Sequence, residues 1–104
     1  MTAPGAIDVS PEKKSTDTFD PGATWRLHPQ VALRPEPFGA LLYHFGTRKL
    51  SFLKNTVIVG VVRSLGDHES VRAALRAHGV DETAERPYLR ALRTLADSHM
   101  IVPA

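Results

Sequence analysis

The side chains in this sequence that could do acid–base or metal chemistry are its five histidines. None belongs to a zinc-binding helix motif or to a tight ligand spacing; they are His28, His44, His68, His78 and His99. The chain has no cysteine, which excludes thiol nucleophiles, disulfides and cysteine-based zinc sites. It also lacks a nucleophile elbow, a glycine-rich phosphate loop and a pair of carboxylates at a catalytic spacing. The sequence therefore predicts a protein that is not an enzyme and that holds no metal and no cofactor.

The main chain offers a different kind of chemistry, because Leu41–Leu53 is predicted to form a β-hairpin. Apolar side chains alternate along both of its arms, and they are Leu41, Tyr43, Phe45, Leu50 and Phe52. Gly46 and Thr47 between the arms suit a two-residue type II′ turn. That turn sets Phe45 opposite Arg48, Tyr43 opposite Leu50 and Leu41 opposite Phe52. The large apolar side chains should then share one face of the hairpin.

The elements around the hairpin predict a small mixed domain. Trp25–Arg34 is expected to be one irregular strand, broken at Pro29 and followed by a turn at residues 35–37. Three helices are expected at Asn55–Leu65, Asp67–Gly79 and Thr83–Met100. The first of them is apolar nearly all round and should be central, although its β-branched residues would also permit a strand.

These elements predict the α+β class, with a winged-helix-like architecture of a three-stranded antiparallel meander followed by three helices. Expected helix boundaries are Asn55 or Thr56, Gly66, Asp67 or His68, Gly79 and Thr83. Met100–Val102 is expected to close the chain as a short extended segment.

Composition divides the chain into a tail and a domain. Residues 1–24 are rich in Pro, Ser, Thr and Gly without apolar periodicity, which predicts a disordered tail before a peptide-recognition domain at 25–104. Basic side chains outnumber acidic ones between residues 48 and 93, which favours an acidic partner. We expect no membrane interaction and a cytoplasmic location, because no apolar run approaches a span of about 20 residues and no signal core is present.

The third strand of the meander, Lys49–Leu53, is the best candidate for a binding site. The first strand is interrupted by Pro29 and bounded by Pro35, whereas no proline occurs between Pro37 and Pro87. The outer N–H and C=O groups of the third strand could therefore accept a peptide as an added strand. On this interpretation Ser51→Pro removes an edge donor. The alternative is that Lys49 and Lys54 only keep the edge from aggregating.

The stretch WRLHPQVALRPEPFGALLYHFGTRKLSFL carries a family resemblance. Together with the following apolar helix, the Gly66-Asp67 break and a last helix ending in LADSHMIV, it resembles the mycofactocin precursor-peptide chaperones. These are relatives of the pyrroloquinoline-quinone peptide chaperones, among the leader-recognition domains of ribosomal peptide modification. The resemblance covers about residues 25–102, and YHFGTRKLSFL is its most specific part.

The resemblance implies a non-catalytic adaptor with a winged-helix-like fold. In this family the leader of a precursor peptide adds as a strand beside the third strand, in a groove formed with the last helix. The adaptor presents the peptide to a radical S-adenosylmethionine maturase, whose iron–sulfur cluster acts on the C-terminal Val-Tyr of the peptide.

Transferred to this sequence, the resemblance implies three groups of peptide-binding residues. The pairing edge would be Lys49, Leu50, Ser51, Phe52 and Leu53. The helical side of the groove would be lined by Tyr88, Leu92 and Leu95, where the core does not need them. Arg90 and Arg93 would hold leader carboxylates by charge-assisted hydrogen bonds.

Two other functions fit the predicted fold. A winged-helix domain can bind DNA, but here the arginines of the helices are scattered and Asn and Gln are few. The open edge could also pair with a second copy and form a homodimer. The resemblance favours the peptide and maturase as partners over nucleic acid.

Overall fold

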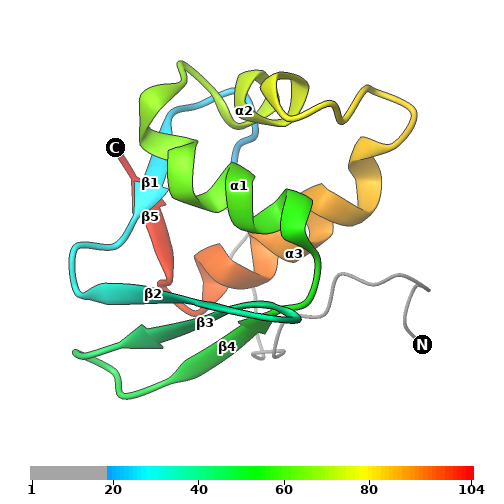
Figure 1. The fold of residues 1–104 in the computed structure, drawn as a ribbon. Coiled ribbons are helices and arrows are strands. Elements are labelled where there is room, and N and C mark those ends of the chain that lie inside the picture. The colour runs from blue at the N-terminus through cyan, green and yellow to red at the C-terminus, as the bar shows by residue number, and fades with distance from the viewer. Residues whose placement is uncertain (1–18) are drawn as a thin grey trace.

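A computed structural model describes residues 19–104 of the chain, so most of the predicted tail lies outside the described residues. An antiparallel sheet of three strands lies below three helices, and two further strands pair beside it (Figure 1). The strands are β1 (Trp25–Leu27), β2 (Val31–Glu36), β3 (Gly39–His44), β4 (Leu50–Leu53) and β5 (Ile101–Pro103). The helices are α1 (Thr56–Ser64), the 3₁₀ turn η1 (Leu65–Asp67), α2 (Val71–Ala77) and α3 (Glu85–Asp97). The predicted α+β class and the meander followed by three helices are confirmed.

The predicted first strand is wrong in one respect, because two strands occupy it. β1 pairs with β5, whereas β2 begins at Val31 and pairs with β3. The predicted turn at residues 35–37 is also wrong, since Pro35 lies inside β2 opposite Ala40. Phe45 N donates to Gln30 O (2.9 Å), and the alternation of antiparallel bonds then places the Pro35 nitrogen on the side away from β3. A proline costs no ladder bond at such an edge position.

The hairpin has the predicted register but a different turn. Tyr43 pairs with Leu50 and Leu41 pairs with Phe52. His44 N donates to Lys49 O (3.0 Å), so four residues, not two, form the loop. The positive φ that a type II′ turn would require at Gly46 occurs instead at Arg48 (φ 66°). Gly46 is needed instead for space, because a Cβ there would meet Gln30 and His44.

The two faces of the sheet differ in side-chain size. The face under the helices carries the buried Ala40, Leu42, Ser51 and Leu53. Leu41, Tyr43, Leu50 and Phe52 do share a face, as predicted, but it is the outer face, and Leu50 and Phe52 are exposed on it. The inner face is packed by small residues together with leucines because helices must approach it closely.

Helix α1 is the central helix, with Ile58, Val61 and Val62 fully buried. Its predicted N-cap is confirmed: Asn55 Oδ1 accepts from Val57 N (2.7 Å) and Ile58 N (3.2 Å). Gly66 is not a left-handed cap, because the chain continues there into η1. Ser70, rather than Asp67 or His68, caps α2, and Gly79 follows it with φ 83°.

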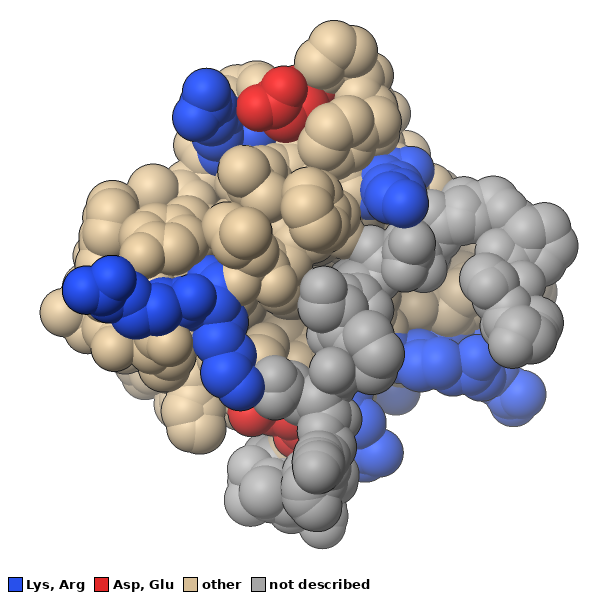
Figure 2. Space-filling view, turned by 90° about the horizontal axis from the view of Figure 1, so that it is seen from below, with Lys and Arg blue, Asp and Glu red and all other residues tan. Residues whose placement is uncertain are grey.

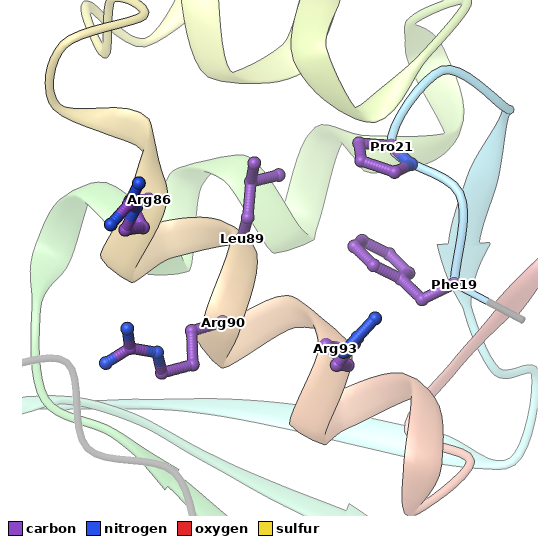
Figure 3. A pocket seen from close by; sticks show the side chains of 6 residues that line it. All are labelled: Phe19, Pro21, Arg86, Leu89, Arg90 and Arg93. Atoms are coloured by element: carbon purple, nitrogen blue, oxygen red, sulfur yellow. The ribbon is translucent and has the colours of Figure 1, made fainter. Parts of the chain in front are cut away.

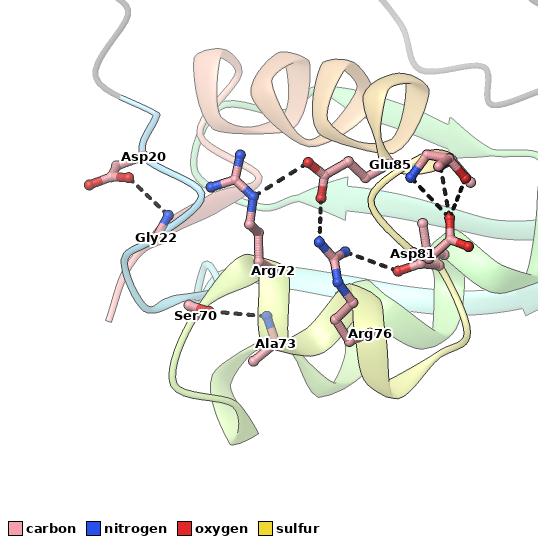
Figure 4. A network of polar contacts seen from close by, with 11 residues as sticks. Asp20, Gly22, Ser70, Arg72, Ala73, Arg76, Asp81 and Glu85 are labelled. Carbon is pink, nitrogen blue, oxygen red and sulfur yellow. Dashed lines mark hydrogen bonds and ion pairs between the residues drawn. The ribbon is translucent and has the colours of Figure 1, made fainter.

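Polar contacts join α2 to the start of α3 (Figure 4). Arg72 Nε and Arg76 Nη2 lie 3.4 and 3.1 Å from the Glu85 carboxylate. The predicted cap Thr83 is wrong, because Ala84 holds the N-cap position of α3. Before this helix, Asp81 Oδ1 accepts from Thr83 Oγ1 and from the Thr83 and Ala84 amides. The hydrogen bond from Thr83, followed by that from Ala84, lowers the pKa of Asp81.

Residues 19–24 belong to the predicted tail, yet they contact the domain. The Phe19 ring lies 5.0 Å from that of Trp25, and Trp25 Nε1 donates to Asp20 O (3.1 Å). Pro21 O and Ala23 O accept from the first amides of α2, at 3.1 and 3.2 Å. No helix within residues 19–104 has the length and apolar character needed to cross a membrane.

Candidate peptide-binding edge

Strand β4 is the outer strand of the β2-β3-β4 sheet. Because His44 and Lys49 are a hydrogen-bonded pair, the next bonded pairs along the ladder are Leu42 with Ser51 and Ala40 with Leu53. The main-chain groups of Leu50 and Phe52 therefore point away from β3. Within residues 19–104 these groups have no hydrogen-bond partner.

This alternation changes the expected effect of one substitution. Ser51 N faces β3, so Ser51→Pro would remove a bond within the sheet rather than an edge donor. Ser51 is also buried, with 1% of its surface exposed. The residues whose backbone donors lie on the open edge are Leu50 and Phe52.

The predicted helical side of the groove divides into core and surface. Leu92 and Leu95 are fully buried and belong to the hydrophobic core, and Tyr88 is half-buried against that core. Arg90, Thr94 and Asp97 follow one another at intervals of four and three residues on a more exposed face of α3. At the end of this face a hollow of about 170 Å³ separates Asp97, Ser98 and His99 from Thr47 and Lys49. The open side of α3 thus meets the start of β4.

The predicted arginines line a second, larger hollow of about 300 Å³. Arg86, Arg90 and Arg93 extend from α3, and Phe19 and Pro21 face this helix from the segment before β1 (Figure 3). Leu89 supplies an apolar wall. The three guanidinium groups have no ion-pair or hydrogen-bond partner among the described residues. This surface is suited to carboxylates next to an apolar side chain.

The His44 side chain binds the loop that precedes β4 by two hydrogen bonds. Its Nδ1 accepts from Gly46 N (3.0 Å) and Thr47 N (3.1 Å), and its ring lies 4.4 Å from that of His28. Burial, and then the neighbouring His28 and His99, lower the pKa of His44 below its ordinary value. The neutral ring that results can keep accepting both amides.

Sequence reasoning missed several residues of these two hollows. Arg86 could have been included, because it stands four residues before Arg90 on the same helix face. Thr94 and Asp97 could have been found by extending that face toward the end of α3. Phe19 and Pro21 carried no signal, since they lie in a segment without apolar periodicity. Within residues 19–104 no three His, Asp or Glu side chains are close enough together to bind a metal ion.

Comparison with known proteins decides the family. The model of the peptide chaperone MftB family matches residues 24–102. The chain belongs to the MftB peptide chaperone family. The resemblance identified from YHFGTRKLSFL is thereby confirmed, and so is the prediction that the protein is not an enzyme, because MftB proteins are peptide chaperones of mycofactocin biosynthesis. Peptide binding is therefore favoured over the DNA-binding alternative.

Three relatives share this description. The MftB peptide chaperone of Mycobacterium ulcerans is 71% identical over 85 residues, which are 82% of this chain and 78% of the relative. That of Mycobacterium tuberculosis is 60% identical over 103 residues, 99% of this chain and 93% of the relative. That of Mycolicibacterium smegmatis is 65% identical over 86 residues, 83% and 84% of the two chains. No solved structure matches the chain at a significant level.

Proposed function

We propose that this MftB-family chaperone binds the leader of its precursor peptide as an added strand along β4 and delivers it to a radical S-adenosylmethionine maturase. The observation that carries the proposal is the row of outward-facing main-chain groups of Leu50 and Phe52. An extended peptide could satisfy these groups with its own N–H and C=O groups. Pro35 makes the opposite edge, along β2, a poorer acceptor.

The residues inferred from the sequence then take distinct roles. Lys49–Leu53 form the pairing strand, with Ser51 and Leu53 anchoring it to β3. Leu92 and Leu95 support the groove from the core, and Tyr88 packs beside them. Arg90 and Arg93 are available for leader carboxylates, because each is exposed and lines the larger hollow.

The chemistry of such a complex belongs to the maturase. The chaperone raises the local concentration of its peptide at the maturase, which makes the modification step effectively intramolecular. The iron–sulfur cluster is the maturase's own, in keeping with a chaperone that supplies no catalytic residue. A cysteine-free chain is compatible with the reducing cytoplasm, where we place this encounter.

The proposal is tested by comparing Leu50→Pro with Leu50→Ala. Both variants lose the leucine side chain, but only proline removes the outward-facing N–H. We expect Leu50→Pro to bind a fluorescently labelled precursor peptide about 5- to 10-fold more weakly than Leu50→Ala, the effect of about one hydrogen bond. Anisotropy titration measures the two dissociation constants.

Circular dichroism of both variants serves as the folding control. Ser51→Pro is the useful contrast, because it should reduce stability by breaking the ladder to β3. With limiting peptide, Leu50→Pro should also slow modification by the maturase. Equal peptide affinities for Leu50→Pro and Leu50→Ala would contradict strand addition at β4.

A further inference from the structure

The outer face of the sheet exposes an unusual amount of apolar surface. In the described part of the chain four large apolar residues are exposed, and all lie on the β2-β3-β4 sheet or its turns: Phe38 (44%), Phe45 (60%), Leu50 (47%) and Phe52 (40%). The Tyr43 and Phe45 rings lie 5.0 Å apart, and those of Phe38 and Phe52 lie 6.1 Å apart. Figure 2 shows the molecule from below, the side on which the sheet lies in Figure 1, and its Lys and Arg side chains stand in separate groups among residues of other kinds. A contiguous apolar face of this kind typically marks an interaction site.

The apolar face and the open edge coincide at two residues. Leu50 and Phe52 carry the outward-facing main-chain groups, and the same two residues place their side chains on the outer face. In an antiparallel ladder, residues that exchange hydrogen bonds also stand directly opposite each other, with their side chains on the same face. Peptide residues that bond to Leu50 and Phe52 would therefore lie two apart and place both side chains on the outer face.

We propose that the leader recognised here carries large apolar side chains at two positions, i and i+2, which pack against Leu50 and Phe52. This inference rests on the proposed strand addition and specifies which side of the added strand is recognised. Position i+1 would stand opposite Ser51 and face the side of the sheet that the helices cover. The precursor peptide is favoured as the occupant because the chain belongs to a peptide chaperone family, and an extended peptide would satisfy the edge groups and cover these two side chains together.

The test is a scan of the precursor peptide against the full chain. Each leader residue is changed singly to Asp, and affinity is measured by anisotropy. We expect two positions, two residues apart, to lose about 10-fold or more, because each removes an apolar contact and puts a charge in its place. Phe52→Lys should restore the affinity of one of these Asp peptides and leave the other weak, which fixes the register.

Matched variants of the protein provide the controls. Phe52→Ser should weaken the wild-type peptide by about 10-fold. Phe45→Ser is the matched control, because Phe45 lies on the same face and is more exposed than Phe52. It should leave peptide affinity unchanged, because Phe45 follows β3 and a strand added beside β4 would not reach it. Both are surface changes, and thermal unfolding checks that both variants are folded.

Failure of this inference differs from failure of strand addition. If Leu50→Pro binds more weakly than Leu50→Ala but Phe52→Ser binds as wild type does, strand addition stands and the apolar contact is wrong. If Leu50→Pro equals Leu50→Ala, both are wrong. Tighter binding by Phe52→Ser would also overturn the inference, since the Phe52 side chain would then oppose peptide binding instead of supporting it. Concentration-dependent dimers abolished by Phe52→Ser, with unchanged peptide affinity, would assign the face to a second copy.

Discussion

At the scale of single residues, His44 should make the hydrogen bonds of the hairpin loop depend on pH. Only 3% of its surface is exposed, and its Nδ1 accepts two loop amides while Nε2 has no partner among the described residues. Protonation would add a hydrogen at Nδ1, which could then no longer accept from Gly46 and Thr47. It would also place a charge in a buried position beside His28 and His99.

We therefore expect stability to fall as the pH is lowered. The folded-state pKa of His44 lies below its unfolded value of about 6.5, so the unfolded chain binds more protons between the two values. The contribution of His44 to stability is fully present above pH of about 6.5 and is lost as the pH falls through the folded-state pKa. Urea unfolding should show a lower free energy of unfolding at pH 5 than at pH 7.5, with part of the loss coming from this group.

His44→Asn is the matched control for this pH dependence. The asparagine oxygen can accept from the amides two and three residues ahead, as Nδ1 does, but it does not titrate. The difference in the free energy of unfolding between pH 7.5 and pH 5 should be smaller in the variant than in the wild type. If wild type and His44→Asn show the same difference, His44 is not the group responsible.

At the scale of elements, the sequence predicts what depends on periodicity. The pairing of Tyr43 with Leu50 follows from the two-residue alternation, which a one-residue slip would invert. The alternation does not predict which face of the sheet is buried, because both faces carry leucines. The helices pack on one face only, and their position determines which leucines are buried. The loop was mispredicted because its amides are bound by the His44 ring, which no turn rule includes.

The candidate site shows the same division. The open edge at β4 could be predicted from the positions of the prolines. The depth of Leu92 and Leu95 could not, because a helical wheel gives the same apolar stripe for a core face and for a groove. The hollow beside Arg93 depends on Phe19, which only the folded chain brings to α3.

At the scale of elements, we predict that the Asn55 cap at the start of α1 stabilises the folded chain. Asn55 follows directly on the end of β4, and its side chain accepts two amides of the first turn. Asn55→Ala should lower the free energy of unfolding by about 1 kcal/mol, whereas Asn55→Asp keeps the acceptor and favours the helix dipole. Chemical denaturation compares the three chains. Equal losses for the Ala and Asp variants would mean that the cap contributes nothing.

At the scale of the whole molecule, the two ends of the described chain close on each other. β1 pairs with β5, with Leu27 opposite Ile101, and Ala104 N donates to Thr24 O (3.0 Å). Residues just before β1 also bind the first turn of α2. Residues 19–24, which the sequence places in the tail, therefore contact β1, α2 and α3.

Truncation at two points measures what that segment contributes. A chain beginning at Phe19 keeps the ring contact with Trp25 and the two main-chain bonds to α2, so it is the reference for a shorter chain. A chain beginning at Trp25 loses them all. Its free energy of unfolding should be lower by about 3 kcal/mol, from the lost hydrogen bonds of Asp20, Pro21, Ala23 and Thr24 and from one partly buried aromatic ring. Equal stability of the two truncated chains would instead place the domain boundary at Trp25, because residues 19–24 would then contribute no net free energy despite their contacts.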